Sequence, residues 1–193
     1  MRNPNRHSYA IQRIVFCVVA VWASALFAQE KPVATLEGAP QTVASLDTVR
    51  YMGNWYEVAR FPNRFQTQCV AKVQAKYSLL PEGRIEVQNS CTLANGQTES
   101  VTGQAKLGSA GLNTQLKVSF LPAYLRWLPV GWGDYWVIDL ARDYRYAVVS
   151  DSSRAYLWLL SRSPALSNAD RIEIETRLRT QGFDLSKLQN TAQ

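Results

Sequence analysis

Short runs of alternating apolar and polar residues recur about every ten residues between residues 53 and 162, and turn-forming residues separate them. In the first run Trp55 and Glu57 fall on one side while Tyr56 and Val58 fall on the other, which is typical of a β-strand with two different faces. The later runs cover residues 70–80, 84–93, 97–107, 115–121, 134–140, 144–150 and 155–162. Most connections are short, so each strand should pair antiparallel with the next.

Eight such strands predict an all-β fold, an eight-stranded antiparallel up-and-down barrel. Closing the sheet into a barrel removes its two unpaired edges, and eight strands leave room for side chains and one small ligand. Trp55 is placed to plug one end of this barrel, and Gly53 gives the backbone room to bend beside it.

The period changes after Pro164, where a helix is expected. Ser167, followed three residues later by Asp170, is a near-match to the capping box, and Gly182 can end the helix. Ile174 and Leu178 lie four residues apart and form an apolar stripe. We therefore expect this C-terminal helix to pack on the outside of the barrel.

The first 28 residues have the pattern of a signal peptide. Arg2, Arg6 and Arg13 come first, and residues 14–27 are almost wholly apolar. This stretch is shorter than the roughly 20 residues that a membrane span needs, although an uncleaved N-terminal anchor is the alternative. Cleavage is possible after Ala25, or after Ala28, which we slightly prefer. Residues 29–45 should then form an extended lead-in to a domain over residues 46–193.

The expected destination is the periplasm, with the protein either free or associated with the outer membrane. Cys17 follows the bulky Phe16, whereas a lipoprotein signal needs a small residue before its cysteine, so we do not expect a lipid anchor. The remaining two cysteines, Cys69 and Cys91, would reach an oxidising compartment, where a disulfide is favoured over two free thiols. However, a hairpin centred on residue 82 places Val73, not Cys69, opposite Cys91.

Charge and histidine content exclude several functions. Cleavage removes three arginines and no acidic residue, so the formal charge falls from +6 to +3, without a basic run that would indicate nucleic-acid binding. The single histidine, His7, leaves with the signal peptide. No imidazole then remains for a catalytic triad, a zinc site or a haem ligand. We expect no metal, no cofactor and no enzymatic activity.

Three short motifs resemble the signatures of the lipocalin family, in particular those of bacterial and apolipoprotein D-like lipocalins. Gly53-Asn54-Trp55 matches the first signature, Asp143-Tyr144 the second and Arg162 the third. The resemblance implies that Arg162 stacks over Trp55 and closes the base of the barrel by a cation–π contact. It also implies that all five signature residues (Gly53, Trp55, Asp143, Tyr144, Arg162) are structural and that none is catalytic.

Alternation along the strands predicts which residues face a ligand. The inward positions in the first half of the barrel are Ala75, Tyr77, Val87, Asn89, Val101, Val118 and Phe120. The later strands are apolar on both faces, and there the resemblance implies that Tyr135, Val137, Val149, Tyr156 and Trp158 point inward. Space for a ligand would come from the small residues Ala75, Gly103 and Ala105. The alternative for every one of these residues is ordinary barrel core.

The segment 121–133 concentrates apolar and aromatic residues in what should be a loop at the open end. It could be a lid over the pocket or an edge that dips transiently into a membrane. The alternatives are a loop folded over its own barrel or a homodimer contact, and the residues leave monomer and homodimer both open.

The resemblance implies a carrier of a small hydrophobic ligand, such as a fatty acid or lysophospholipid, for lipid storage, transport or membrane maintenance. Two alternatives remain: a module that docks a partner protein through segment 121–133, and an isomerase of the lipocalin type that uses a pocket thiol.

Overall fold

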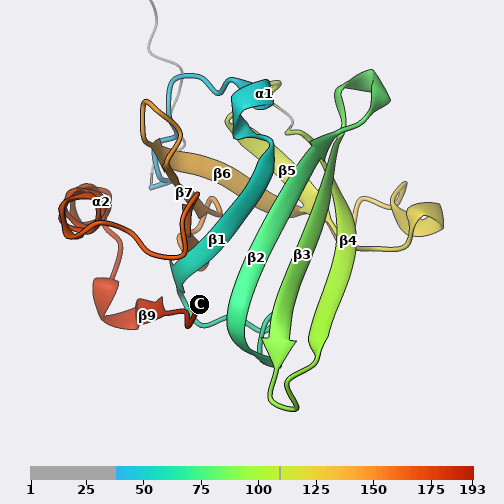
Figure 1. The fold of residues 1–193 in the computed structure, drawn as a ribbon. Helices are drawn as coiled ribbons and strands as arrows, with labels where there is room; N and C mark the ends of the chain where they lie inside the picture. Colours follow the sequence, from blue (N-terminus) through green and yellow to red (C-terminus); the bar gives the residue numbers. More distant parts are fainter. Residues whose placement is uncertain (1–37, 109) are drawn as a thin grey trace, which may run out of the picture. The chain divides into compact units, whose positions relative to one another are not determined.

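The computed structural model describes residues 38–108 and 110–193, and within them it shows a closed antiparallel β-barrel (Figure 1). The strands are β1 Gly53–Arg60, β2 Cys69–Leu79, β3 Ile85–Leu93, β4 Thr98–Leu107, β5 Gln115–Ser119, β6 Gly133–Leu140, β7 Tyr146–Ser150, β8 Leu157–Ser161 and β9 Gln189–Asn190. Sequential strands from β1 to β8 pair antiparallel, and β8 pairs with β1 to close the ring. The predicted eight-stranded up-and-down barrel is thus confirmed, with one short strand added.

The described residues also contain two α-helices, α1 Thr48–Tyr51 and α2 Asn168–Thr180, and three short 3-10 helices, η1 Pro81–Gly83, η2 Ala123–Leu125 and η3 Leu185–Lys187. None of them has the length and apolar character that a membrane-spanning helix requires. The predicted signal peptide (1–28), with Cys17, and the first part of the lead-in lie outside the described residues. The later lead-in packs on the barrel, where the Val43 N–H donates to the carbonyl of Val137 at 3.0 Å.

The C-terminal tail completes the wall where β1 and β2 separate. These two strands pair only from Gly53↔Tyr77 to Tyr56↔Gln74. Beyond that point β9 pairs with Ala59 and Arg60. The backbone N–H of Lys72 on β2 then donates to the carbonyl of Ala192, at 2.7 Å. The tail therefore lies between the two strands on the side of the barrel where they part.

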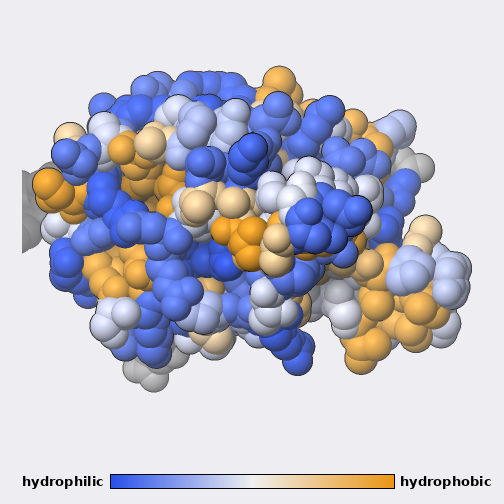
Figure 2. All heavy atoms as spheres, turned by 60° about the horizontal axis from the view of Figure 1, so that its bottom comes forward, coloured by the Kyte–Doolittle hydropathy of each residue, from blue (hydrophilic) through white to orange (hydrophobic). Residues whose placement is uncertain are grey.

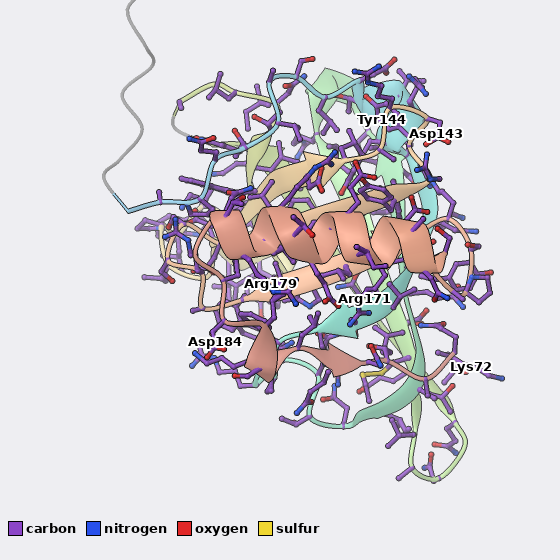
Figure 3. The ribbon with its side chains drawn as sticks, turned by 90° about the vertical axis from the view of Figure 1, so that its left-hand side faces the viewer. Lys72, Asp143, Tyr144, Arg171, Arg179 and Asp184 are labelled. Atoms are coloured by element: carbon purple, nitrogen blue, oxygen red, sulfur yellow. A yellow bond between two sulfur atoms is a disulfide. The ribbon has the colours of Figure 1, made fainter. Side chains whose placement is uncertain are left out.

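The barrel has apolar contacts on both sides of its sheet. One buried cluster fills the interior around Trp55, Val137 and Val149, and a second lies between the outer face of the strands and α2. Ile174 and Leu178 of α2 belong to the outer cluster, and Figure 3 shows α2 lying across the strands. This covering helix explains why β7 is buried along its whole length.

Helix α2 begins and ends as expected. The Ser167 hydroxyl accepts a hydrogen bond from the Asp170 N–H at 3.1 Å, which satisfies one of the free donors of the first turn. Gly182 follows the last turn with φ of +78°, a conformation in which a side chain would be strained.

The base of the barrel is held by Arg162. Its guanidinium lies 3.8 Å from the ring centroid of Trp55 and donates to the carbonyls of Asn54, Arg50 and Met52 at 2.7–2.8 Å. The Trp55 indole in turn donates to the carbonyl of Tyr51, at 2.9 Å. These contacts attach α1 and the start of β1 to the end of β8.

The second signature holds the same end of the barrel from the turn between β6 and β7 (Figure 3). The Tyr144 hydroxyl accepts from the backbone N–H of Asp47, which caps α1, at 2.8 Å. The guanidinium of Arg50 on α1 lies 4.1 Å from the Tyr144 ring centroid. Asp143 is exposed and forms an ion pair with Arg145 at 3.0 Å. Tyr144 therefore positions α1, which covers the closed end.

The predicted disulfide between Cys69 and Cys91 is confirmed, with 5.6 Å between the two Cα atoms. The hairpin register that sets Val73 opposite Cys91 holds as far as Gln74↔Ser90, and β2 bulges beyond that pair. The β2–β3 pairing shifts twice, on either side of Ala71, and Lys72 takes a positive φ of 52°. Such bulges insert extra residues into one strand, and this brings Cys69 level with Leu93 and within reach of Cys91.

Candidate ligand-binding site

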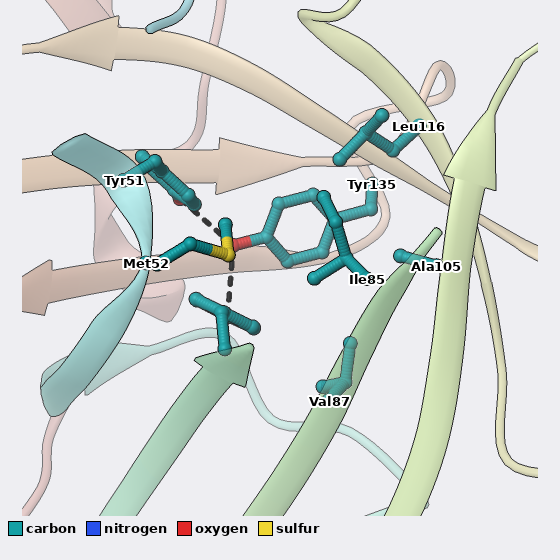
Figure 4. A pocket seen from close by; sticks show the side chains of 8 residues that line it. Tyr51, Met52, Ile85, Val87, Ala105, Leu116 and Tyr135 are labelled. Atoms are coloured by element: carbon teal, nitrogen blue, oxygen red, sulfur yellow. Dashed lines mark hydrogen bonds between the residues drawn. The ribbon is translucent and has the colours of Figure 1, made fainter. Parts of the chain in front are cut away.

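The closed half of the barrel interior is almost entirely apolar. A small cavity there is lined by Tyr51, Met52, Tyr77, Ile85, Val87, Ala105, Leu116 and Tyr135 (Figure 4). Its free volume of about 10 Å³ is no more than one water molecule needs. The side chains come from α1, from the link to β1 and from five strands, so the cavity lies at the axis of the barrel.

Three tyrosines form a chain of hydroxyl groups in this cavity. The Tyr135 hydroxyl lies 2.8 Å from that of Tyr51 and 2.9 Å from that of Tyr77 (Figure 4). Burial raises the pKa of Tyr77 to about 12 and raises the pKa values of Tyr51 and Tyr135 well above their usual range. All three phenols are therefore neutral and carry their hydrogens at physiological pH.

Two side chains fill the space that the small residues were expected to leave. A Cβ added to Gly103 would lie 2.6 Å from the ring of Phe120, so that ring occupies the volume over the glycine. Met52 extends into the cavity from the end of α1 (Figure 4). Methionine has an unbranched, flexible side chain, and Phe120 lies just past the end of β5, so both can move more easily than residues within a strand.

A polar network lies on the interior side at the opposite, mouth end of the barrel. Glu57 is buried, and its carboxylate accepts from Arg60 and from the Gln66 amide, both at 2.7 Å. The Gln66 carbonyl oxygen accepts from the indole N–H of Trp158 at 2.9 Å. Thr191 of the C-terminal tail adds a hydroxyl donor to Glu57 at 2.6 Å. The barrel interior thus changes from apolar at its base to charged and hydrogen-bonding towards its mouth.

Asn89 adds an open hydrogen-bonding position to this interior. It pairs with Ala75 on β2 and Val101 on β4, so its side chain shares the inward face of Ala75. Its Oδ1 atom is buried and has no hydrogen-bond partner among the described residues. A buried acceptor of this kind is unfavourable unless a ligand or water donates to it.

Most of the residues predicted to face a ligand lie in or against the interior cluster. These residues are Ala75, Tyr77, Val87, Val118, Tyr135, Val137, Val149 and Trp158. Tyr156 stacks on Trp158, with 5.8 Å between ring centroids. Sequence reasoning missed Tyr51 and Met52 because they precede the first strand, where no alternating pattern assigns a face.

Two predicted positions differ from the closed pocket that was expected. Val101 is 47% exposed and Phe120 is 37% exposed. The reason is the length of β5: its pairing with β4 stops at Gln104↔Ser119, so the mouth half of β4 pairs with β3 but has no strand on its other side. Solvent therefore reaches Val101 from the unpaired edge.

The loop of residues 121–132, here called the apolar loop, stands out from the barrel wall beside β4 and β5 (Figure 1). Tyr124 is 75% exposed and Trp127 78% exposed, and Figure 2 shows apolar surface gathered on the lobe that this loop forms at the lower right. Trp132 anchors the loop against Lys106, whose Nζ lies 4.0 Å from the ring centroid. The loop does not fold over the barrel interior, so its interpretation as a lid is wrong.

The described residues offer little for catalysis or metal binding. No group of three or more His, Cys, Asp or Glu side chains among them could hold a metal ion. Cys69 and Cys91 form a disulfide bond, so neither supplies a thiol nucleophile. What remains is a closed barrel with an apolar base and a polar mouth, and this architecture defines a class of proteins that bind small molecules inside the barrel.

The chain belongs to the lipocalin family, because the family model described as "Lipocalin-like domain" matches residues 46–193. Lipocalins bind small hydrophobic ligands and are generally not enzymes. The resemblance drawn from the three signature motifs is thus confirmed.

Several curated relatives are similar over most of their length. Temperature-induced lipocalin-1 of Arabidopsis thaliana is 39% identical over 155 residues, which cover 79% of this chain and 82% of the relative. Outer membrane lipoprotein Blc of Escherichia coli K12 is 38% identical over 146 residues, 75% and 78% of the two chains. Mouse apolipoprotein D is 31% identical over 163 residues, 80% of each chain.

Solved structures show the same fold at lower identity. Insecticyanin from the tobacco hornworm Manduca sexta superposes with a TM-score of 0.63 at 20% identity, over 80% of this chain and 84% of that one. At this level of identity, the similarity shows only that the two proteins share the barrel fold.

Proposed function

We propose that this lipocalin is exported and carries a single-chain amphiphile, a fatty acid or a lysophospholipid, within the cell envelope, for lipid storage, transport or membrane maintenance. The polarity gradient of the interior carries this proposal. The base around Ile85, Val87 and Leu116 suits methylene groups, and the mouth with Arg60 and Asn89 suits an acid, phosphate or hydroxyl group.

Binding of an acyl chain requires space that the two filling side chains occupy. Met52 and Phe120 would turn aside as the chain enters, and the apolar wall beneath them would replace water around it. Each buried methylene contributes about 0.8 kcal/mol, against several kcal/mol for association and for ordering the chain. A chain of more than about ten carbons therefore offsets these costs and still leaves a carrier that can release its ligand.

The apolar loop is proposed to touch the membrane during ligand exchange. Exposed aromatic side chains gain free energy at the bilayer interface, and Trp127 and Tyr124 are both largely exposed. The predicted signal peptide supports export. The similarity to Blc, which is named an outer membrane lipoprotein, supports an envelope location.

Lipid analysis of the purified mature protein tests the carrier proposal. Mass spectrometry should find a fatty acid or lysophospholipid bound to the barrel, and delipidated protein should bind a long-chain lysophospholipid again in titration. The variant Met52→Ala should bind it at least as tightly as the wild type, because the side chain that fills the cavity is gone. Val49→Ala is the matched control, since Val49 lies on α1, three residues before Met52, but is exposed. The proposal would be refuted if the purified protein carries no lipid and the delipidated protein does not bind lysophospholipid in titration.

The apolar loop also suits a second candidate function, the docking of a partner protein. The double variant Trp127→Ser and Leu128→Ser separates the two. If the loop touches membranes, the variant should lose lipid transfer between vesicles while its affinity for lysophospholipid in solution stays unchanged. Unchanged vesicle transfer, together with loss of a partner that co-purifies with the wild type, would instead favour docking.

A further inference from the structure

The three tyrosine hydroxyls at the base of the barrel carry one hydrogen more than they can use among themselves. Each phenol has one O–H donor, and the chain Tyr51–Tyr135–Tyr77 contains two hydrogen bonds. Whichever way these bonds run, one of the three hydrogens is left without an acceptor. The described residues provide no further hydrogen-bond partner for any of the three hydroxyls.

This surplus donor lies in the wall of the apolar cavity, whichever of the three hydroxyls carries it. Tyr51 is 2% exposed and Tyr77 6% exposed, and all three tyrosines line the cavity. The other side chains of the lining are aliphatic, apart from the thioether of Met52, which accepts hydrogen bonds only weakly. An unpaired donor in such a place costs free energy comparable to a lost hydrogen bond, so the cavity favours any molecule that brings an acceptor.

We propose that the hydroxyl chain is an acceptor subsite, a site that donates a hydrogen bond to an acceptor atom of the ligand. It selects ligands with a carbonyl or ether oxygen at the apolar end that enters the barrel first. The inference rests on the proposed carrier function and narrows its ligand class to chains oxygenated far from the head group. A carbonyl oxygen satisfies the surplus donor and brings no hydrogen of its own. A water molecule would bring two further hydrogens into a wall where only the phenol oxygens accept well.

The test compares two probes that differ only at the acceptor, 2-decanone and 2-methyl-1-decene, by competition against a bound fluorescent fatty acid. Wild-type protein should bind the ketone about tenfold more tightly than the alkene, because one buried neutral hydrogen bond is made instead of lost. The infrared band of the bound ketone carbonyl should also shift to lower frequency. Both measurements are repeated in Met52→Ala, so that limited access to the cavity is not mistaken for a missing subsite.

The number of hydroxyl hydrogens left without an acceptor predicts which tyrosine variants keep the preference for the ketone. Tyr51→Phe and Tyr77→Phe should each keep the ketone preference, since two hydroxyls share one hydrogen bond and one hydrogen is still left over. The triple variant Tyr51→Phe, Tyr77→Phe and Tyr135→Phe should lose both the preference and the infrared shift, and should bind the alkene as well as the ketone. Its fold is checked by thermal unfolding, and phenylalanine keeps the ring packing.

The possible outcomes separate this inference from the carrier function. Equal binding of both probes by the wild type and by Met52→Ala, or an unshifted carbonyl band, would overturn the acceptor subsite while leaving the carrier intact. A ketone preference that survives in the triple variant would also overturn it. If neither probe nor lysophospholipid binds any variant, the carrier function itself is wrong.

Discussion

Replacing Arg162 by methionine should weaken the fold by about 3 kcal/mol. The guanidinium makes three hydrogen bonds to the carbonyls of Asn54, Arg50 and Met52. Because the residue is only half-buried, we assign about 1 kcal/mol to each bond, below the usual value for a charged donor. The stack on Trp55 adds about 1 kcal/mol, and the methionine side chain recovers about 1 kcal/mol by packing on the same ring.

The measurement is urea unfolding of the mature protein, followed by tryptophan fluorescence. Arg162→Lys should lose about 2 kcal/mol, because an ammonium keeps the charge over Trp55 but cannot reach three carbonyls with the geometry of a guanidinium. Arg142→Met is the matched control: this arginine is exposed at the same end of the barrel, and its loss should change the free energy of unfolding by less than about 0.5 kcal/mol. A loss below about 1 kcal/mol in Arg162→Met would refute the view that Arg162 holds the base of the barrel.

Two further perturbations test other parts of the fold. Replacing Cys69 and Cys91 together by serine should reduce the free energy of unfolding by about 3 kcal/mol, because the disulfide closes a chain segment of 22 residues in the unfolded state. Urea denaturation measures this loss, and an unchanged midpoint would contradict the prediction. The Arg145 guanidinium, 2.6 Å from Asp170, lowers the pKa of that carboxyl. The ion pair therefore stabilises the folded protein above about pH 4, and this stabilisation is lost as the pH falls below that value. Asp170→Asn should therefore be less stable than the wild type at pH 7 but nearly equal to it at pH 2, and a difference that persists at pH 2 would show that the charge is not responsible.

Local patterns in the sequence determined the architecture of this protein. Alternation with a period of two, interrupted by turn residues, is a property of neighbouring residues, and it predicted eight strands in the correct order. Ser167 and Gly182 marked the limits of α2 because helix caps depend on the residue type at one position. The pairing of Cys69 with Cys91 followed from their number and the expected compartment.

Tertiary structure decided the details of the interior, because these depend on contacts between residues far apart in the chain. The bulges beside Lys72 bring Cys69 within reach of Cys91, and no local pattern marks them. The Phe120 ring fills the space above Gly103 because the β4–β5 register, which ends at Gln104↔Ser119, brings the two residues opposite each other.

The same holds for the polar groups that the barrel encloses. Alternation placed Glu57 on the face of Trp55, but its partners come from a loop and from Thr191, near the end of the chain. The hydroxyl chain joins Tyr51, Tyr77 and Tyr135, which lie on α1, β2 and β6. Closure of the barrel brings these residues together, and side-chain packing then determines how much space a ligand finds between them.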